Sequence, residues 1–301
     1  MDLLQLSYFK VVAHLEHMTR AAEELHISQP SLSKAIIQLE KQLGVPLFDR
    51  IGKRIRLNPF GKAFLLRVDR VFQELKEAKI ELADLSGHER GLVLLGTTTT
   101  RLLPNLLCEY LEQYPQVNIR LHQIPTRETM LQLEKGEIDL LISSPPLEQP
   151  GISTIPILNE EIFLVVSPKH HLASYHSVCL RDIASEPFIH LTMDYEYRHF
   201  TNLLCNQAGF EPNIVFESND PEVILSMVKS GLGVALIPDN WWNNTGVKEA
   251  PVRLHIEEPN CYRTIGLSWV ASRYMSVASR DFQSFIFNYF SKLSAQNKKG
   301  F

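Results

Sequence analysis

Residues 19–44 read TRAAEELHISQPSLSKAIIQLEKQLG and carry the clearest structural signal in the chain. Thr19 can cap a short helix, and after a brief break Ser28 is a natural N-cap for a second one. Pro30 falls in the first turn of that second helix, where its missing N–H costs nothing, and Gly44 supplies the C-terminal stop. The apolar stripe between them consists of Leu32, Ile36, Leu39 and Leu43. Two short helices joined by a tight turn predict a helix-turn-helix.

Polar side chains at the start of the second helix have the chemistry that reads base edges in a major groove. Gln pairs with adenine, Ser with either strand, and Lys with guanine or phosphate. The predicted DNA contacts at this helix end are Gln29, Pro30, Ser31, Ser33 and Lys34. The alternative is a solvated polar helix end, which any globular helix can show.

Residues 45–57 extend the basic character of this region. Their apolar ends flank Gly52, which predicts a two-stranded turn with Gly52 and Lys53 near its tip. From such a wing, Arg50, Lys53 and Arg54 are expected to reach backbone phosphates or a narrow minor groove. Residues 28–58 carry six basic and two acidic side chains, whereas the whole chain has a formal charge of −4. This patch indicates one polyanion-binding surface, with a solvated charge run as the alternative.

A long helix is predicted next, capped by Asn58 and running to about Leu85. Its apolar residues recur at alternating steps of four and three, a pattern typical of a coiled-coil seam. The predicted dimerisation residues are Phe64, Val68, Val71, Leu75, Ala78, Leu82 and Leu85. Residues 86–91 are then expected to form a hinge.

Beyond Gly91, buried strands alternate with helices, which predicts an α/β domain with mostly parallel sheets. Ligands bind such sheets beyond the carboxyl ends of the strands, where helix N-termini attract small anions. Polar residues follow or end the predicted strands 92–96, 138–143 and 187–191. The predicted effector contacts there are Thr97, Thr98, Thr99, Thr100, Ser143 and Thr192. The threonines could instead only cap a helix. Arg101 and Arg127 are expected to be surface charges, with neutralisation of an acidic ligand as the alternative.

Several other classes of site find little support in the sequence. His170 and His171 are adjacent and would be poorly placed to share one ion from a strand or helix, so no metal and no cofactor are expected. No nucleophile elbow, P-loop or dinucleotide fingerprint stands in its required context. The four cysteines lack a C-x-x-C pair, which favours a reducing compartment, with redox sensing by Cys179 and Cys205 left open. With neither a signal peptide nor a membrane span expected, the predicted location is cytoplasmic.

A longer pattern runs through the N-terminal third. It reads Ala21-Ala22-x-x-Leu25-x-Ile27-Ser28-Gln29-Pro30-Ser31-Leu32-Ser33-Lys34-x-Ile36-x-x-Leu39-Glu40-x-x-Leu43-Gly44-x-x-Leu47-Phe48-x-Arg50, and continues through Gly52-Lys53, Leu57 and Gly61. This region strongly resembles the LysR-type transcriptional regulators. The order of the remaining segments fits the same family, strictly over residues 1–61 and loosely after Gly91.

The resemblance implies a winged helix-turn-helix domain (1–58), a linker helix with hinge (59–90) and an effector-binding domain (91–301). The effector domain would be α/β, with two Rossmann-like lobes similar to type 2 periplasmic binding proteins. Lobe I would span about 91–161 and 266–301, and lobe II about 162–265. Departures from the family pattern are Asn58 for Thr, Lys53 for Arg, apolar Ile37, and a short segment between Gly96 and Leu102.

The function implied is that of a transcriptional regulator rather than an enzyme. It would bind double-stranded promoter DNA as a homodimer that assembles into a homotetramer, respond to a small anionic effector, and contact RNA polymerase. Two rival classes are a stand-alone solute-binding protein and an enzyme that uses its N-terminal helices for assembly. Loss of DNA affinity at high salt distinguishes a regulator from both.

Overall fold

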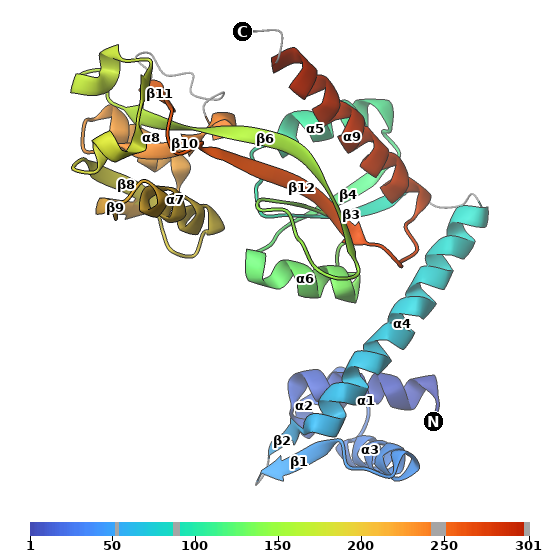
Figure 1. Cartoon of the computed structure of the whole chain (residues 1–301). Coiled ribbons are helices and arrows are strands. Elements are labelled where there is room, and N and C mark those ends of the chain that lie inside the picture. Colours follow the sequence, from blue (N-terminus) through green and yellow to red (C-terminus); the bar gives the residue numbers. More distant parts are fainter. Residues whose placement is uncertain (52–53, 87–90, 242–250, 298–301) are drawn as a thin grey trace. The chain divides into compact units, whose positions relative to one another are not determined.

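The computed structural model describes residues 1–51, 54–86, 91–241 and 251–297. The chain forms two compact units, Met1–Gly87 and His88–Phe301, and the helix expected as a separate linker belongs to the first of them. Figure 1 labels most of the helices and strands of both units. Among the described residues, no helix is both long and apolar enough to cross a membrane.

The first unit begins with the helices α1 (Leu3–Leu15), α2 (Met18–Glu24) and α3 (Gln29–Leu43). Ser28 caps α3 through its hydroxyl, and Gly44 ends it with a φ of 73°, both as predicted. The start of α2 differs from prediction. Helix α2 begins before Thr19, and the ring of His17 is its N-cap instead.

The wing is an antiparallel pair of strands, β1 (Phe48–Ile51) and β2 (Arg54–Leu57). The Glu40 carboxylate of α3 accepts the Leu47 amide at 2.7 Å and so ties the start of the wing to α3. Asn58 then caps α4 (Pro59–Ser86) by accepting the Gly61 amide at 2.8 Å. A Cβ at position 61 would lie 2.1 Å from the Leu47 carbonyl oxygen, so only glycine fits there.

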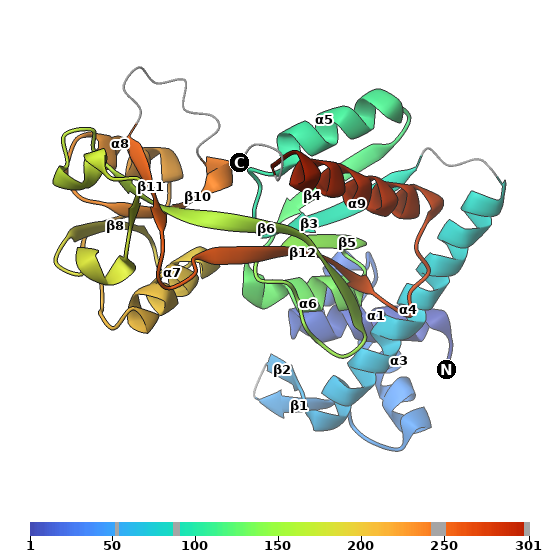
Figure 2. The same ribbon diagram turned by 45° about the horizontal axis from the view of Figure 1, so that its top comes forward.

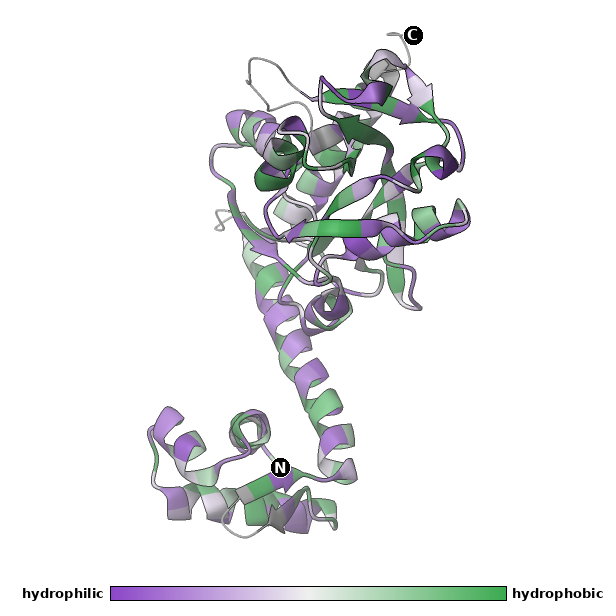
Figure 3. Ribbon diagram, turned by 90° about the vertical axis from the view of Figure 1, so that its left-hand side faces the viewer, coloured by the Kyte–Doolittle hydropathy of each residue, from purple (hydrophilic) through white to green (hydrophobic). Residues whose placement is uncertain are grey.

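The first turns of α4 complete the core of this unit, which corrects part of the predicted dimer seam. Val68 is 2% exposed within that core, and the Phe64 ring lies 5.2 Å from the ring of Phe9. Val68 is therefore occupied within its own chain, whereas Phe64 is half-buried and stays a predicted seam residue. The rest of the predicted seam, exposed on the isolated chain, comprises Val71, Leu75, Ala78, Leu82 and Leu85. Figure 3 shows the alternation of apolar and polar segments along α4.

The second unit is built on a mixed sheet rather than the mostly parallel one expected. Its strands run in the order β4 (Asn118–Gln123), β3 (Leu92–Thr97), β5 (Leu140–Ser143), β12 (Tyr262–Val270), β6 (Ile152–Val166), β11 (Val252–Ile256) and β7 (Ser177–Val178), with β10 (Ala235–Pro238) also on β6. Strands β3, β4 and β5 are parallel, as predicted. The long strands β6 and β12 are antiparallel to each other and run side by side through both halves of the unit (Figure 2).

Two lobes follow from the separate apolar cores along β6 and β12. Lobe I packs α5 (Leu103–Gln113) and α9 (Val277–Asn297) on its sheet, with Ile157 and Ile265 in its core. Lobe II has Ile162 and Cys261 in its core. The chain therefore passes between the lobes at residues 159–161 and 262–264, and Ile265 packs in the core of lobe I.

The other elements surround these cores. In lobe I, α6 (Thr126–Lys135) connects β4 to β5. In lobe II, β8 (Pro187–Leu191) and β9 (Asn213–Ser218) form a parallel pair, flanked by α7 (Glu196–Gln207) and α8 (Pro221–Lys229).

Candidate functional site: nucleic-acid interface and ligand cleft

The start of α3 presents the predicted base-reading side chains to solvent. Gln29, Pro30, Ser31 and Lys34 are exposed, and Ser33 is half-buried. The Ser31 hydroxyl lies 2.8 Å from the Ser28 hydroxyl, so it is shared with the cap of its own helix. An uncovered polar helix start beside a wing is the arrangement by which winged helix-turn-helix domains enter a major groove.

The structure describes the predicted basic contacts of the wing only in part. Arg50 and Arg54 occupy strands β1 and β2, paired with Ile55 and Ile51 respectively. Lys53 lies outside the described residues, as do the side chains of Arg50 and Arg54. Their phosphate contacts therefore stay predictions.

A cleft of about 1040 Å³ lies between lobe I and lobe II. Thr98, Thr99 and Thr100 line it from lobe I, and Thr192 lines it from lobe II, where they were predicted to contact an effector. The Thr98 hydroxyl also accepts the Ser144 amide at 3.2 Å, which ties this loop to the end of β5.

Two of the predicted effector contacts are corrected by their burial. Thr97 is 0% exposed, and its hydroxyl bonds both the amide and the carbonyl of Thr99. Ser143 is 2% exposed, and its hydroxyl donates to the Pro145 carbonyl at 3.0 Å. Both side chains point into the protein and stabilise the loops that line the cleft.

Helix starts converge on this cleft. Its lining includes residues at or just before the starts of α5, α6 and α7, and none of these helices has a side-chain cap. The first amides of a helix lack intrahelical partners and carry the positive end of the dipole. The cleft thus offers backbone N–H donors to a negatively charged or hydrogen-bond-accepting ligand.

Arginines at the cleft were largely missed by the sequence reasoning. Arg101, expected as a surface charge, lines the cleft, where its guanidinium lies 5.6 Å from the Trp241 ring centre. Its ion pair with the exposed Glu222 is long, at 3.8 Å. Arg127, by contrast, has a side chain that is 83% exposed and lies outside the cleft, as expected.

Arg263 was not predicted at all. It faces Glu160 across the β6–β12 pair, and its Nε donates to that carboxylate at 2.7 Å in a buried ion pair. Its guanidinium lies 5.0 Å from the Tyr197 ring centre, and among the described residues its buried Nη2 has no hydrogen-bond partner. The sequence offered one signal for Arg263, a charged residue at the start of an apolar strand. Only the pairing of β12 with β6 shows that Arg263 lines the cleft.

The walls of the cleft also carry carboxylates and a half-buried tyrosine. Glu217 is neutralised by Arg198 at 2.8 Å, whereas Asp194 and Glu196 complete the acidic part of the lining. The Tyr197 hydroxyl donates to the Leu236 carbonyl at 3.0 Å. Burial raises the pKa of Tyr197 well above its usual value, although Arg263 acts in the opposite direction, so this phenol stays neutral.

Comparison with known proteins assigns the two units. Residues 3–62 match the family described as bacterial regulatory helix-turn-helix protein, lysR family, and residues 86–291 match the LysR substrate binding domain. The chain belongs to the LysR family. It is a DNA-binding transcriptional regulator with a substrate-binding domain, and its relatives are regulators rather than enzymes.

Curated relatives match this LysR-family chain over nearly its full length. YybE of Bacillus subtilis, an HTH-type transcriptional regulator, is 36% identical and covers 97% of this chain and 100% of its own. The transcriptional dual regulator GltC of the same organism is 33% identical and covers 97% of this chain and 99% of its own.

Solved structures confirm the fold. Full-length OxyR from Pseudomonas aeruginosa is 24% identical and superimposes with a TM-score of 0.70, over 96% of this chain and 94% of its own. Full-length CbnR complexed with its target DNA is 22% identical, with a TM-score of 0.65, over 96% of this chain and 99% of its own.

Proposed function

We propose that this LysR-family regulator binds promoter DNA through α3 and the wing, and that a small anionic molecule in the cleft modulates this binding. Two chains would pair along the exposed part of α4, and two such pairs would form a tetramer that contacts RNA polymerase. Ligand would bind one relative arrangement of the lobes better than another and shift its population.

The DNA-binding half of the proposal is supported by the exposed start of α3. Gln29 is exposed at the first position of α3, where a side chain reaches base edges when the helix enters a groove. CbnR, which has the same fold, was solved in complex with its target DNA.

Substitution of Gln29 tests base reading by α3. Gln29→Ala removes one bidentate contact and is expected to weaken binding to the selected site by about 1–3 kcal/mol, while non-specific binding changes little. Sites selected from random duplex DNA and then titrated by fluorescence anisotropy give both affinities.

The matched control for this experiment is Gln38→Ala. Gln38 is also exposed on α3, but it lies nine residues further along, half a turn away around the helix axis. Equal losses from both substitutions would contradict base reading by the start of α3.

The ligand half of the proposal is carried by one observation. Helix starts without side-chain caps and the side chain of Arg263 line the same cleft. Among the described residues, the buried Nη2 of Arg263 has no hydrogen-bond partner. A carboxylate or another small oxyanion would accept hydrogen bonds from these donors, and Arg101 would add charge at the rim. The acidic residues Asp194 and Glu196 would then favour a ligand that also carries a donor group.

A panel of small carboxylic acids and their matching primary amides tests the preference for an anion. The acids that bind are expected to raise the thermal unfolding midpoint of the full chain, and their amides are expected to have no effect. Arg101→Gln should weaken the effect of the acids, whereas Arg127→Gln, on a solvent-exposed side chain, should leave it unchanged. A panel in which amides and acids act equally would contradict an anionic effector.

A further inference from the structure

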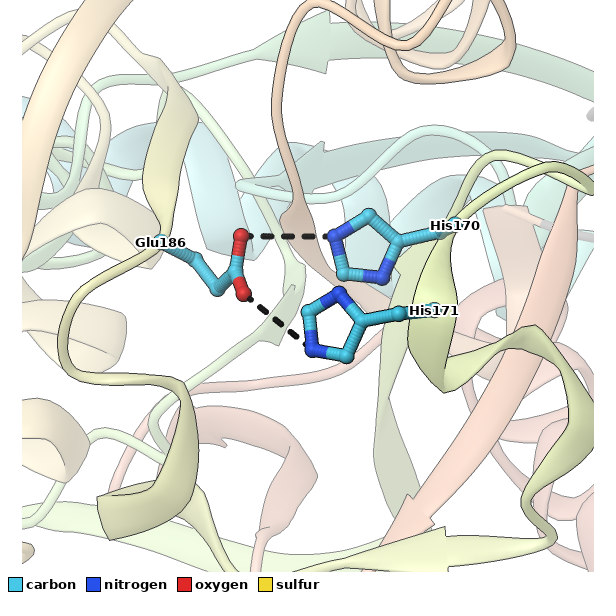
Figure 4. A group of neighbouring side chains, drawn as sticks. All are labelled: His170, His171 and Glu186. Atoms are coloured by element: carbon cyan, nitrogen blue, oxygen red, sulfur yellow. Dashed lines mark hydrogen bonds and ion pairs between the residues drawn. The ribbon is translucent and has the colours of Figure 1, made fainter.

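A second cluster of polar side chains lies in lobe II, among residues that do not line the cleft. His170 and His171 follow strand β6, where His170 caps the short helix η1 (His171–Ser174). Glu186 directly precedes strand β8. The fold brings together segments that are separated by 16 residues in the chain, and Figure 4 shows both rings turned towards the carboxylate.

The donor atoms of these three residues converge on a small volume. His170 Nε2 lies 3.3 Å from one Glu186 oxygen, and His171 Nε2 lies 3.6 Å from the other. The two rings have centres 4.4 Å apart, and one donor atom from each residue lies within 4.8 Å of the others. His170 and Glu186 have side chains that are 17% exposed, whereas that of His171 is 68% exposed, which leaves a path for an ion from solvent.

The objection that adjacent histidines cannot share an ion does not hold at this place. That objection assumes a strand or a regular helix, in which neighbouring side chains diverge. His170 instead has extended backbone angles, with φ −70° and ψ 146°, and His171 begins the short helix. The change of backbone direction between them allows both rings to face Glu186.

The chemistry of this donor set selects a class of ion. Two imidazoles and one carboxylate are the ligands of open zinc sites, in which water takes the fourth position. Imidazole-rich sites favour Zn²⁺, Co²⁺ and Ni²⁺ over Mg²⁺ and Ca²⁺, which prefer oxygen ligands. One carboxylate and two neutral rings leave the occupied site with a single positive charge.

Binding also requires a proton to move within His170. Its Nδ1 accepts the Leu172 amide at 3.3 Å, so the neutral ring carries its proton on Nε2 and donates it to Glu186. Coordination of the ion through Nε2 moves this proton to Nδ1, so no proton is released. Nδ1 then no longer accepts the Leu172 amide, and this long hydrogen bond is replaced by a metal–nitrogen bond at Nε2. Hydrogen bonds of this kind are strongest at about 2.9–3.0 Å, so a weak contact is given up.

We propose that His170, His171 and Glu186 form a binding site for one divalent transition-metal ion of the zinc class. The ion would cross-link the segment after β6 to the start of β8 and thereby stabilise lobe II. The site is separate from the effector cleft and does not depend on the proposed function of that cleft.

Titration of the metal-free, untagged full-length chain with Co²⁺ tests the proposal. Tetrahedral Co²⁺ has an intense visible absorption band, which is expected to saturate at one ion per chain. His171→Ala and Glu186→Gln should each lower the affinity by more than about 100-fold, since even outer-shell partners of metal sites contribute roughly 10–100-fold. The thermal unfolding midpoint should rise with Co²⁺ in the parent chain but not in these two variants.

The matched control is His176→Ala, because His176 is exposed in the same region of lobe II but is not part of the cluster. This variant should bind Co²⁺ like the parent. Circular dichroism without metal verifies that all variants are folded, and His171 can be truncated without loss of a buried contact. Absence of saturable binding, or binding that survives both His171→Ala and Glu186→Gln, would overturn the proposal.

Discussion

His190 shows how burial sets the chemistry of a single side chain in lobe II. It lies on β8 with 4% exposure, and its Nδ1 is 3.4 Å from the Thr201 hydroxyl. Burial, and secondarily the charge of Arg198, lowers the pKa of His190 to about 3. The folded chain therefore keeps this ring neutral at pH values where the unfolded chain protonates it.

This difference predicts a pH dependence of stability. The unfolded chain takes up a proton as the pH falls through about 6.5, and the folded chain does not until about 3, so stability is lost over that interval. Between pH 7 and pH 5 the loss attributable to His190 is about 2 kcal/mol. His190→Gln should remove this contribution from the pH profile of the unfolding free energy, measured in urea.

His199→Gln provides the control, because His199 is exposed on the neighbouring helix α7. Its profile should follow that of the parent chain. If His190→Gln left the slope between pH 7 and pH 5 unchanged, the depressed pKa of His190 would be wrong.

At the scale of secondary-structure elements, α4 has two different roles along its length. Its start packs into the helix-turn-helix core through Phe64 and Val68. Its second half leaves apolar side chains exposed, with Leu82 at 66% and Leu85 at 78%. A stripe that is uncovered on one chain and continues the seam spacing favours a second copy of the same helix as its partner.

The dimer prediction compares two leucines of equal exposure on α4. Leu82, on the seam, and Leu66, off the seam, are both 66% exposed. Leu82→Lys should weaken dimerisation at least about tenfold, because it buries a charge in an apolar seam, whereas Leu66→Lys should have little effect. Sedimentation equilibrium measures both, and the reverse ranking would place the dimer contact elsewhere on α4.

At the scale of the whole molecule, the chain consists of two units with separate cores. Phe9 is fully buried in the first, and Phe282 is fully buried in lobe I of the second. Stability should therefore be perturbed unit by unit, since substitutions without shared neighbours act independently.

Calorimetry of the full-length chain tests this separation. Phe9→Ala should lower the unfolding free energy of the first unit by about 3–5 kcal/mol and shift one transition, and Phe282→Ala should shift only the other. A single transition that both substitutions move equally would show that the units unfold together.

The sequence predicted most of the features whose signal is local, although His17 rather than Thr19 caps α2. The caps at Ser28, Gly44 and Asn58 and the wing depend on side chains within a few residues of the backbone they control. The parallel strands of lobe I were predicted from the alternation of apolar strands with helices along the chain. Thr98, Thr99 and Thr192 could be placed at the cleft because the carboxyl ends of parallel strands meet at one edge of a sheet.

Contacts between segments that are distant in the chain could be determined only from the tertiary structure. Burial removed Thr97 and Ser143 from the cleft and Val68 from the dimer seam, because the packing of distant segments over each residue determines whether its side chain is exposed. Pairing of β6 with β12 brought Arg263 to the cleft, and the turn after β6 brought His170 to Glu186. Local patterns specify helices, caps and turns through short-range sterics and hydrogen bonds, whereas long-range packing determines which polar groups face solvent, ligand or one another.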